Sequence, residues 1–504
     1  MKALFKISIV CSLILSQIVA SQEIIDEEVV ARIKMEAFQN SKIMETLSYI
    51  TDVYSPRIPG TPNYDKVTQW CVNRLKEWGI EHSKLESFSP IPKGWAVKHC
   101  SIEMIKPQYL VIFGHPKMYS PSTLGILQGE PVLVNIKSLK DTEKYKGKLK
   151  NKIILNGFQP GSNPHFKPNA TRYDEKQVRE LNQEINIGSK DTPEWFDAII
   201  DRYFRNVREV IPFLRNEGIA ALIESSDRDH GIIKAIPHGY ILNPDSLFPV
   251  FKIAQEQFGR LVRIIQKDIP VELRLDLQTI QYEDTIGYNV IAELPGSDRK
   301  LKNEVVMIGA HLDMLNVGTG TCDNGASCTV MMEVMRIIKK LDLKPRRTIR
   351  MGLWSGEELG FLGSSAYVLK HYGDRNSNSR LPEHKDLSAY FNMDAGTGKI
   401  RGINLQGNEI TRPIFEAYFR PFKYLGVDII TTRNALGTDH QPFNWVGLPG
   451  FNFIQDPIEY YRVVHSNMDV YEAAIEDDLK QAAAVIASVI YHAAMRDEKF
   501  PRKE

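Results

Sequence analysis

The fold is decided by one stretch, EVVMIGAHLDMLNVGTGTCDNGASCTVMMEVMRIIKKL, residues 304–341. It begins with an apolar, β-rich run over 304–311, which is typical of a buried strand. Residues 326–341 then repeat apolar side chains at helical spacing. The apolar face of this helix comprises Val330, Val334, Ile337, Ile338 and Leu341. A strand followed by a helix is the repeating unit of α/β domains.

The same alternation continues on both sides of this stretch. Apolar, β-rich runs lie at 289–294, 347–354, 387–394 and 449–455, and helical patterns lie at 363–371 and 476–495. We therefore expect an α/β domain over 284–504, with a mixed sheet and helices on both faces. A further amphipathic helix is predicted over 64–79.

Residues 118–283 have a different character. Short β-like runs at 131–136, 152–158 and 220–225 are separated by Gly, Pro and Asn, and a helix-like stretch covers about 193–216. This pattern predicts a separate small domain inserted into the first one. Residues 22–45 are helical and amphipathic, and they are either a pro-segment or the first helix of the main domain.

The N-terminus has the features of a secretory signal peptide. Lys2 and Lys6 precede 14 mainly apolar residues over 7–20, and small residues follow. The run is short for a membrane helix, which needs about 20 residues. We expect residues 1–21 to be removed, the alternative being an uncleaved anchor. No later segment holds a long apolar run, so no membrane span is expected after cleavage.

Composition and small motifs restrict the function classes. The chain has 504 residues with 63 Lys and Arg against 62 Asp and Glu, which argues against nucleic acid as a partner. The sequon at Asn169 lies in a polar stretch suited to a glycosylation acceptor. Four cysteines remain after signal cleavage, and their pairing stays open. They are Cys71, Cys100, Cys322 and Cys328.

Side chains that bind metals follow the predicted strands. In open α/β sheets, sites form beyond the carboxyl ends of the strands. Two histidines and several acidic residues end or follow these runs. In chain order these residues are His311, Asp313, Asp323, Glu357, Glu358, Asp394 and His465.

This set of nitrogen and oxygen ligands suits Zn²⁺. Five ligands exceed the three that one catalytic zinc normally takes, so two metal ions sharing a carboxylate fit better. One of the adjacent residues Glu357 and Glu358 can then ligate while the other acts as a base. Asp313, two residues beyond His311, is placed to hold the other imidazole nitrogen. Each residue alone is more often structural, and the joint pattern carries the hypothesis.

The motifs GAHLDMLNVGTGTCDNGAS (309–327), WSGEELGFLGS (354–364), NMDAG (392–396), GTDHQPF (437–443) and VVHSNMD (463–469) resemble one known family. It is the binuclear zinc peptidase family of bacterial aminopeptidases and glutamate carboxypeptidase II. The resemblance implies a peptidase domain formed by 46–117 and 284–504. It further implies that the insert, 118–283, is a protease-associated (PA-like) domain.

The resemblance also implies individual roles. Two zinc ions per chain would be held by His311 and Asp394 on one side, by Glu358 and His465 on the other, and by Asp323 between them. Glu357 would be the general base. Many relatives carry a Tyr where this chain has Val464, which leaves Tyr460 or Tyr461 as the oxyanion donor. The family also often has a cis peptide after the bridging Asp, here Asp323–Asn324.

The resulting hypothesis is a zinc exopeptidase that is secreted, extracellular or lysosomal, reached through the ER and Golgi. Its substrates would be dipeptides or short peptides with free N-termini, and a homodimer is implied by the family. Three alternatives are a glutaminyl-cyclase-like acyltransferase with one zinc, a catalytically inactive receptor-like relative, and a di-zinc aminoacylase-type peptidase. The last expects a longer gap between the first His and the bridging Asp.

Overall fold

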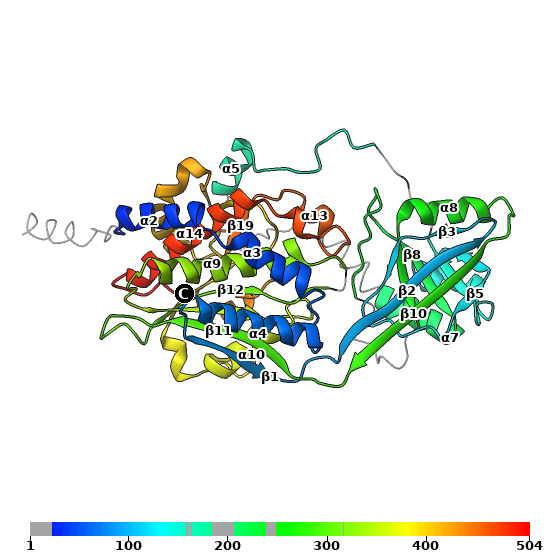
Figure 1. Cartoon of the computed structure of the whole chain (residues 1–504), viewed down its shortest axis with the longest axis horizontal. Helices are drawn as coiled ribbons and strands as arrows, with labels where there is room; N and C mark the ends of the chain where they lie inside the picture. Colours follow the sequence, from blue (N-terminus) through cyan, green and yellow to red (C-terminus); the bar gives the residue numbers. More distant parts are fainter. Residues whose placement is uncertain are drawn as a thin grey trace, which may run out of the picture.

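The computed structural model describes residues 23–157, 161, 164–183, 206–237, 248–315 and 317–503. The predicted signal peptide, 1–21, lies outside the described residues, as does the first part of the helix-like stretch at 193–216. Figure 1 shows two lobes, a larger one built around a long sheet and a smaller one reached through two long strands. Among the described residues, no helix has the length and apolar character that crossing a membrane requires.

The larger lobe contains a mixed sheet, as the sequence predicted. This sheet has eight strands. Their order across the sheet is β1 (His82–Phe88), β11 (Gly287–Leu294), β13 (Thr348–Trp354), β12 (Val305–His311), β16 (Leu387–Asn392), β19 (Gly450–Gln455), β17 (Ile400–Asn404) and β18 (Ile429–Thr431). The four neighbours β13, β12, β16 and β19 are parallel. Their carboxyl ends therefore meet at one edge of the sheet.

Helices cover both faces of this sheet, which confirms the predicted fold class. The larger apolar core receives α2 (Glu27–Gln39), α3 (Ile43–Ser48), α4 (Pro62–Glu77), α9 (Ala326–Lys340), α11 (Arg412–Phe419) and α14 (Glu476–Met495). A second core, centred on Trp354 and Tyr390, receives α10 (Leu362–His371) and α12 (His440–Trp445). Helix α9 is buried over almost its whole length, so its apolar side chains anchor the segment that precedes it.

The first helix is part of the main core. Val29, Val30, Ile33 and Ala37 of α2 are buried in the cluster that also holds α9 and α14. Asp26 caps the helix by accepting a hydrogen bond from Val29 N at 3.0 Å. This packing is that of a first domain helix, so it favours that interpretation over a separable pro-segment.

The smaller lobe is built from two sheets. An antiparallel sheet contains β3 (Leu110–Val111), β2 (Gly94–Lys106), β10 (Glu272–Tyr282) and β5 (Leu127–Gly129). A mixed sheet contains β4 (Gly114–Pro116), β9 (Val250–Ile253), β8 (Ala221–Ser225), β7 (Ile153–Asn156) and β6 (Pro131–Val134). Helices α7 (Ile211–Glu217) and α8 (Gln255–Ile265) pack on this lobe.

The smaller lobe begins earlier than the sequence predicted. Strand β2 pairs with β10 along its length, from Gly94 opposite Tyr282 to Lys106 opposite Glu272. The lobe therefore starts at Gly94. Residues 94–117 were expected in the larger lobe but belong to the smaller one. Strands β1 and β11 pair up to Phe88 opposite Gly287, so the whole lobe is inserted between two paired strands.

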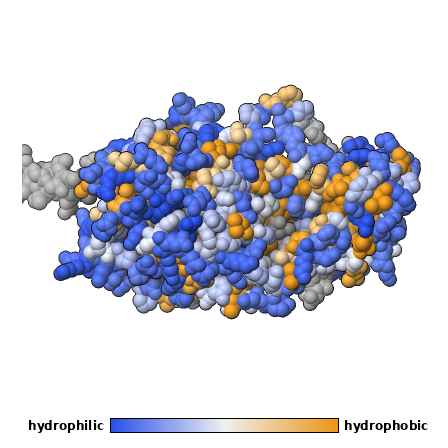
Figure 2. Space-filling model, viewed as in Figure 1, coloured by the Kyte–Doolittle hydropathy of each residue, from blue (hydrophilic) through white to orange (hydrophobic). Residues whose placement is uncertain are grey.

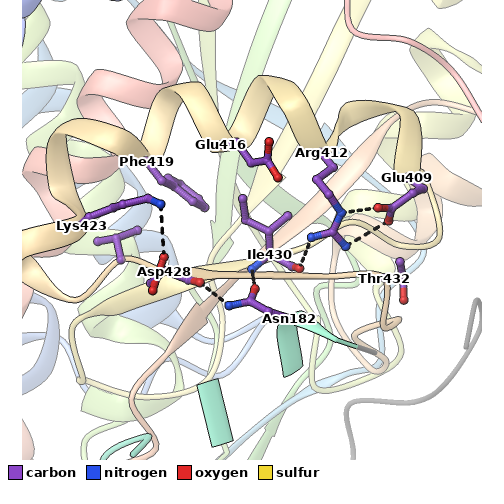
Figure 3. Close-up of a pocket in the computed structure, with 10 residues that line it drawn as sticks. Asn182, Glu409, Arg412, Glu416, Phe419, Lys423, Asp428, Ile430 and Thr432 are labelled. Atoms are coloured by element: carbon purple, nitrogen blue, oxygen red, sulfur yellow. Dashed lines mark hydrogen bonds and ion pairs between the residues drawn. The ribbon is translucent and has the colours of Figure 1, made fainter. Parts of the chain in front are cut away.

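One segment of the insert returns to the larger lobe. Residues 164–183, called the strap here, end in helix α5 (Glu175–Asn182), which lies over the larger lobe in Figure 1. The side-chain amide of Asn182 accepts a hydrogen bond from Ile430 N at 2.8 Å and donates one to Asp428 O at 2.6 Å. It thereby pairs with the free edge of β18, beside a surface pocket (Figure 3).

The strap is fixed at two further points. Thr171 pairs with Ile458 in an antiparallel bridge. Arg172 binds the carboxylates of Asp456 at 2.8 Å and Asp478 at 2.7 Å. The four cysteines described in the structure are free thiols.

Candidate metal centre

Four neighbouring strands deliver the expected side chains to one edge of the main sheet. His311 is the last residue of β12, and Glu357 and Glu358 follow β13. Asp394 follows β16, and His465 lies beyond β19 after the short helix α13 (Tyr460–Val463). The parallel arrangement of these strands therefore brings together residues that are up to 154 positions apart in the sequence (311 to 465).

Asp323 occupies the centre of the group. It lies in the turn Thr321–Gly325 that leads into α9, with a non-helical backbone. Its Oδ1 is 3.1 Å from Nε2 of His311, and its Oδ2 is 2.9 Å from Nε2 of His465. Each oxygen of one carboxylate thus faces a different histidine. The peptide bond between Asp323 and Asn324 is cis, as the family resemblance implied.

Two sets of three ligand atoms result. His311, Asp323 and Asp394 form one set, in which Asp394 Oδ1 is 3.5 Å from His311 Nε2. Asp323, Glu358 and His465 form the other, in which Glu358 Oε1 is 3.0 Å from His465 Nε2. Within each set all ligand atoms lie within 4.8 Å of one another, so each set could hold one metal ion.

The donor set fits a divalent cation. Asp394 Oδ1 and Glu358 Oε1 are buried and accept no hydrogen bond from the part of the chain that the structure describes. Buried carboxylate oxygens without a donor are costly unless a cation satisfies them. Two imidazoles with three carboxylates are the mixed ligation that zinc accepts.

The histidines are held in a strongly negative environment. Burial alone would lower the pKa of His311, but the carboxylates of Asp394 and Glu357 outweigh it and raise the pKa well above its usual value. Burial likewise opposes the charge on His465, and Glu358 and Asp323 raise its pKa to about 10. A site that attracts protons this strongly attracts metal cations for the same reason.

Glu357 stands apart from both ligand sets. It lines the same cavity as Asp323 and Asp394 but contributes to neither trio. Burial raises the pKa of Glu357 well above its ordinary range, His311 opposes this and the carboxylate of Asp394 adds to it. A carboxyl group with a raised pKa beside the ligands is suited to accept and return a proton.

Asp313 supports the centre in a different way than the sequence suggested. Nδ1 of His311 is 3.1 Å from the backbone oxygen of Asp313 and 3.6 Å from its carboxylate. The main chain is therefore the hydrogen-bond partner, and the tautomer with Nδ1 protonated leaves Nε2 free as a ligand. The carboxylate is used elsewhere, because it accepts hydrogen bonds from the backbone N–H groups of Glu357 and Glu358.

The site opens into a cavity of about 250 Å³. Tyr460 and Tyr461, the two expected oxyanion donors, both line it. The pKa of Tyr460 is raised well above its usual value by burial and by nearby carboxylates, chiefly Asp323 and Asp394. Tyr461 is 41 % exposed and lies at the rim, so Tyr460 is the better placed of the two.

Three residues near the site were not expected from the sequence. Tyr173 of the strap lines the cavity, and Lys234 of the smaller lobe lies close to the segment carrying His465. Asp439 is fully buried, and burial raises its pKa to about 7. Asp439 belongs to the quoted motif GTDHQPF, which offered a signal. Tyr173 and Lys234 had none, because only the docking of the smaller lobe brings them here.

The predicted glycosylation site, Asn169, is not among the residues that line this cavity. Asn169 is exposed on the strap, and its side-chain oxygen is 2.8 Å from Nδ1 of His165.

Comparison with known proteins finds a family that matches the part of the chain carrying this site. Residues 289–490, which include all six ligand and base residues, match peptidase family M28. Carboxypeptidase Q of Homo sapiens is 25% identical over 460 residues, covering 91% of this chain and 86% of the relative. Leupeptin-inactivating enzyme 1 of Streptomyces exfoliatus is 32% identical over 176 residues, covering 34% of this chain and 37% of the relative.

Solved structures share the fold. The crystal structure of a peptidase M28 precursor from Shewanella amazonensis SB2B has a TM-score of 0.70 at 22% identity and covers 95% of this chain and 98% of that one. A zinc aminopeptidase from Bacillus subtilis has a TM-score of 0.59 at 21% identity, with coverage of 90% and 94%. The chain is therefore a metallo-exopeptidase whose residues 289–490 match peptidase family M28 and which resembles carboxypeptidase Q over most of its length.

Proposed function

We propose that this chain is a secreted or lysosomal exopeptidase that uses two zinc ions to hydrolyse dipeptides or short peptides with free N-termini. The single observation that carries the proposal is the position of Asp323, whose two oxygens each face one histidine. In the proposed site, His311 and Asp394 would hold one ion, Glu358 and His465 would hold the other, and Asp323 would contribute to both. The zinc aminopeptidase of similar fold supports the choice of metal.

The residues of the chain have separate tasks in this scheme. Bound zinc would lower the pKa of a coordinated water and polarise the scissile carbonyl. Glu357, which belongs to neither ligand set, takes the proton of the attacking water and returns it to the leaving amine. Asp313 holds the backbone of Glu357 in place from behind. Tyr460, which lines the cavity, would donate its hydroxyl to the oxygen that becomes negative.

The cavity supports short substrates. Its volume of about 250 Å³ suits a few residues rather than a folded chain. Tyr173 of the strap forms one wall. The strap is anchored before this residue by Thr171 and Arg172, and after it by helix α5. Glu357, a lining carboxylate that belongs to neither ligand set, would attract the α-ammonium group of a free N-terminus. A blocked N-terminus would lack this attraction.

The secretory part of the proposal rests on residues 1–21 and on Asn169, which is exposed as a glycan acceptor must be.

The homodimer implied by the family has a surface available in the smaller lobe. Figure 2 shows hydrophobic residues on this lobe, and those exposed there include Tyr109, Val111, Phe113, Leu124 and Ile126. Light scattering of the secreted protein, before and after removal of glycans, tests both points.

The function is tested with the variant Glu357→Gln. We expect it to keep two zinc ions per chain by elemental analysis and to lose at least about a thousandfold in kcat, because only the proton acceptor is removed. The matched control is Glu416→Gln, which changes the same group at the separate surface pocket of Figure 3. A panel of dipeptides with free and blocked N-termini measures activity.

The outcomes separate the alternatives. Retained activity in Glu357→Gln would exclude Glu357 as the base. One zinc per chain with cyclisation of N-terminal Gln would identify an acyltransferase of the glutaminyl-cyclase type. Two zinc ions without hydrolysis of any peptide would identify an inactive, receptor-like relative.

A further inference from the structure

A loop of the smaller lobe is fastened to the segment that carries His465. Ala235 N donates a hydrogen bond to His465 O at 3.1 Å, and Lys234 pairs with Ser466 in an antiparallel bridge. Asn467 N donates to Ile233 O at 3.2 Å, and Asn467 Oδ1 accepts from Ile233 N at 2.7 Å. These contacts fix the backbone of Lys234 directly beside one residue of the metal centre.

The side chain of Lys234 brings a positive charge to this place. It is only partly exposed, and its ammonium group interacts electrostatically with the carboxylates of Asp323 and Glu358. Burial, the largest influence, lowers the pKa of Lys234, and these carboxylates and Asp227 oppose that effect. Among the described residues, no carboxylate lies within ion-pair distance of its Nζ. The ammonium group is therefore close to the centre but not committed to a partner there.

Neighbouring cations of the smaller lobe are already paired. Lys117 and Lys252 both bind Glu224, at 3.2 and 3.6 Å. Arg228 binds Asp227 and also donates to the backbone oxygen of Tyr461. Lys234 thus differs from these cations, since it lies beside the segment of His465 and makes no ion pair with the described residues.

The cavity needs such a charge if a substrate carboxylate is to enter. Its lining contains the carboxyl groups of Asp323, Glu357, Glu358 and Asp394, which would offset the charge of two zinc ions and leave the centre with little net attraction for another anion. One residue beyond the scissile bond spans at most about 3.6 Å, so the terminal carboxylate of a dipeptide stays near the centre. Each further residue would carry that carboxylate away by a similar distance.

We propose that Lys234 binds the free C-terminal carboxylate of the substrate and so makes the enzyme selective for dipeptides. The inference rests on the proposed peptidase function and adds the residue that recognises the C-terminal end of the substrate. An ammonium group offers three donors to a carboxylate, and such charge-assisted hydrogen bonds are stronger than neutral ones. The smaller lobe thereby supplies a specificity residue to a centre built entirely by the larger lobe.

The test compares a dipeptide with its C-terminal amide. We expect the wild-type enzyme to prefer the free acid by about ten- to a hundredfold in kcat/KM. In Lys234→Met the preference should fall to near one, through a loss confined to the free acid. Lys234→Arg should retain most of it, because the positive charge remains. Lys148→Met, which removes an exposed lysine of the same lobe, is the matched control.

Binding supplies a readout that does not depend on turnover. In the Glu357→Gln background, calorimetry should show the free acid binding about tenfold or more tightly than the amide, and Lys234→Met should abolish the difference. The inference is overturned if Lys234→Met keeps the preference, or if it weakens acid and amide equally, as a structural defect would. A wild-type enzyme that hydrolyses amide and acid equally overturns it while leaving the peptidase function intact. Hydrolysis of neither refutes the proposed function itself.

Discussion

The carboxylate of Asp313 accepts a hydrogen bond from the backbone N–H of Glu357 at 3.1 Å. Its second oxygen is 3.3 Å from the N–H of Glu358, and the side chain is fully buried. The loop after β12 thereby holds the loop after β13, which carries both glutamates of the centre. One acidic residue thus sets the position of the proposed base without facing the substrate.

This relationship predicts the effect of Asp313→Asn. The amide can accept one of the two hydrogen bonds, but its NH₂ group faces the other N–H. We expect kcat to fall by about 10- to 100-fold, as is common when a residue supporting a metal site is changed. The zinc content should stay near that of the wild type. Asp477→Asn on the exposed first turn of α14 is the control, and equal losses in both variants would contradict the prediction.

Arg57 should be essential for stability. Its guanidinium is fully buried and donates to the backbone oxygens of Leu312 at 2.7 Å, Thr319 at 2.7 Å and Gly320 at 2.8 Å. Arg57→Met would leave these acceptors without donors, each costing about 1–3 kcal/mol. We expect urea unfolding to show a loss of at least about 3 kcal/mol. Arg179→Met, at an exposed ion pair on α5, should cost less than about 1 kcal/mol.

Glu86 should make stability depend on acid pH. Burial would raise its pKa, but hydrogen bonds from His371 at 2.8 Å and from Lys370 lower the pKa to about 2. Because the folded-state value lies below the unfolded one, Glu86 stabilises the fold above about pH 4.5, and the effect is lost as the pH falls toward 2. Glu86→Gln should therefore lower the free energy of unfolding by about 1–2 kcal/mol at pH 6.

The measurement is urea unfolding of both proteins over a pH series. The difference between them should shrink steadily below about pH 4.5. A difference that stays constant down to pH 2 would show that the charge of Glu86 is not involved.

Metal removal should destabilise the larger lobe. Chelation leaves the carboxylates of Asp323, Glu358 and Asp394 close together, and the apo-protein loses the binding free energy. Zinc at 100 times its dissociation constant contributes about 2.7 kcal/mol. We expect the melting temperature to fall on chelation and to recover with Zn²⁺. Ca²⁺ should not restore it, because Ca²⁺ prefers six to eight oxygen ligands.

The strap should control substrate affinity. Arg172→Met removes the contacts to Asp456 and Asp478 and loosens the wall that Tyr173 provides. We expect KM to rise about fivefold, equivalent to about 1 kcal/mol, with kcat nearly unchanged. Limited proteolysis should cut the strap faster in the variant. A change in kcat alone would contradict this role.

Much of the larger lobe was predictable because it is repetitive. The runs that became β12, β13, β16 and β19 are mainly apolar, as is typical of strands buried on both faces. Parallel strands place their following residues at one edge, so the approach of His311 to Asp394 followed from order alone. The contact of His311 Nδ1 with the backbone oxygen of Asp313 could not be predicted in this way, because every residue carries a backbone carbonyl.

The smaller lobe was predicted less well. Strand β10 has a readable alternation in Leu273, Leu275 and Leu277, but this pattern does not identify β2 as its partner. The approach of Tyr173 and Lys234 to the centre could not be predicted, because it depends on how two lobes dock. No local pattern encodes such a contact.

The pairing of Phe88 with Gly287 has a consequence for engineering. The two ends of the insertion lie side by side, so a short turn could replace the smaller lobe and leave every strand of the main sheet in register. Such a minimal enzyme would be expected to fold with its ligand residues in place. It would lack Tyr173 and Lys234, so its substrate cavity would be more open and its substrate selectivity lower.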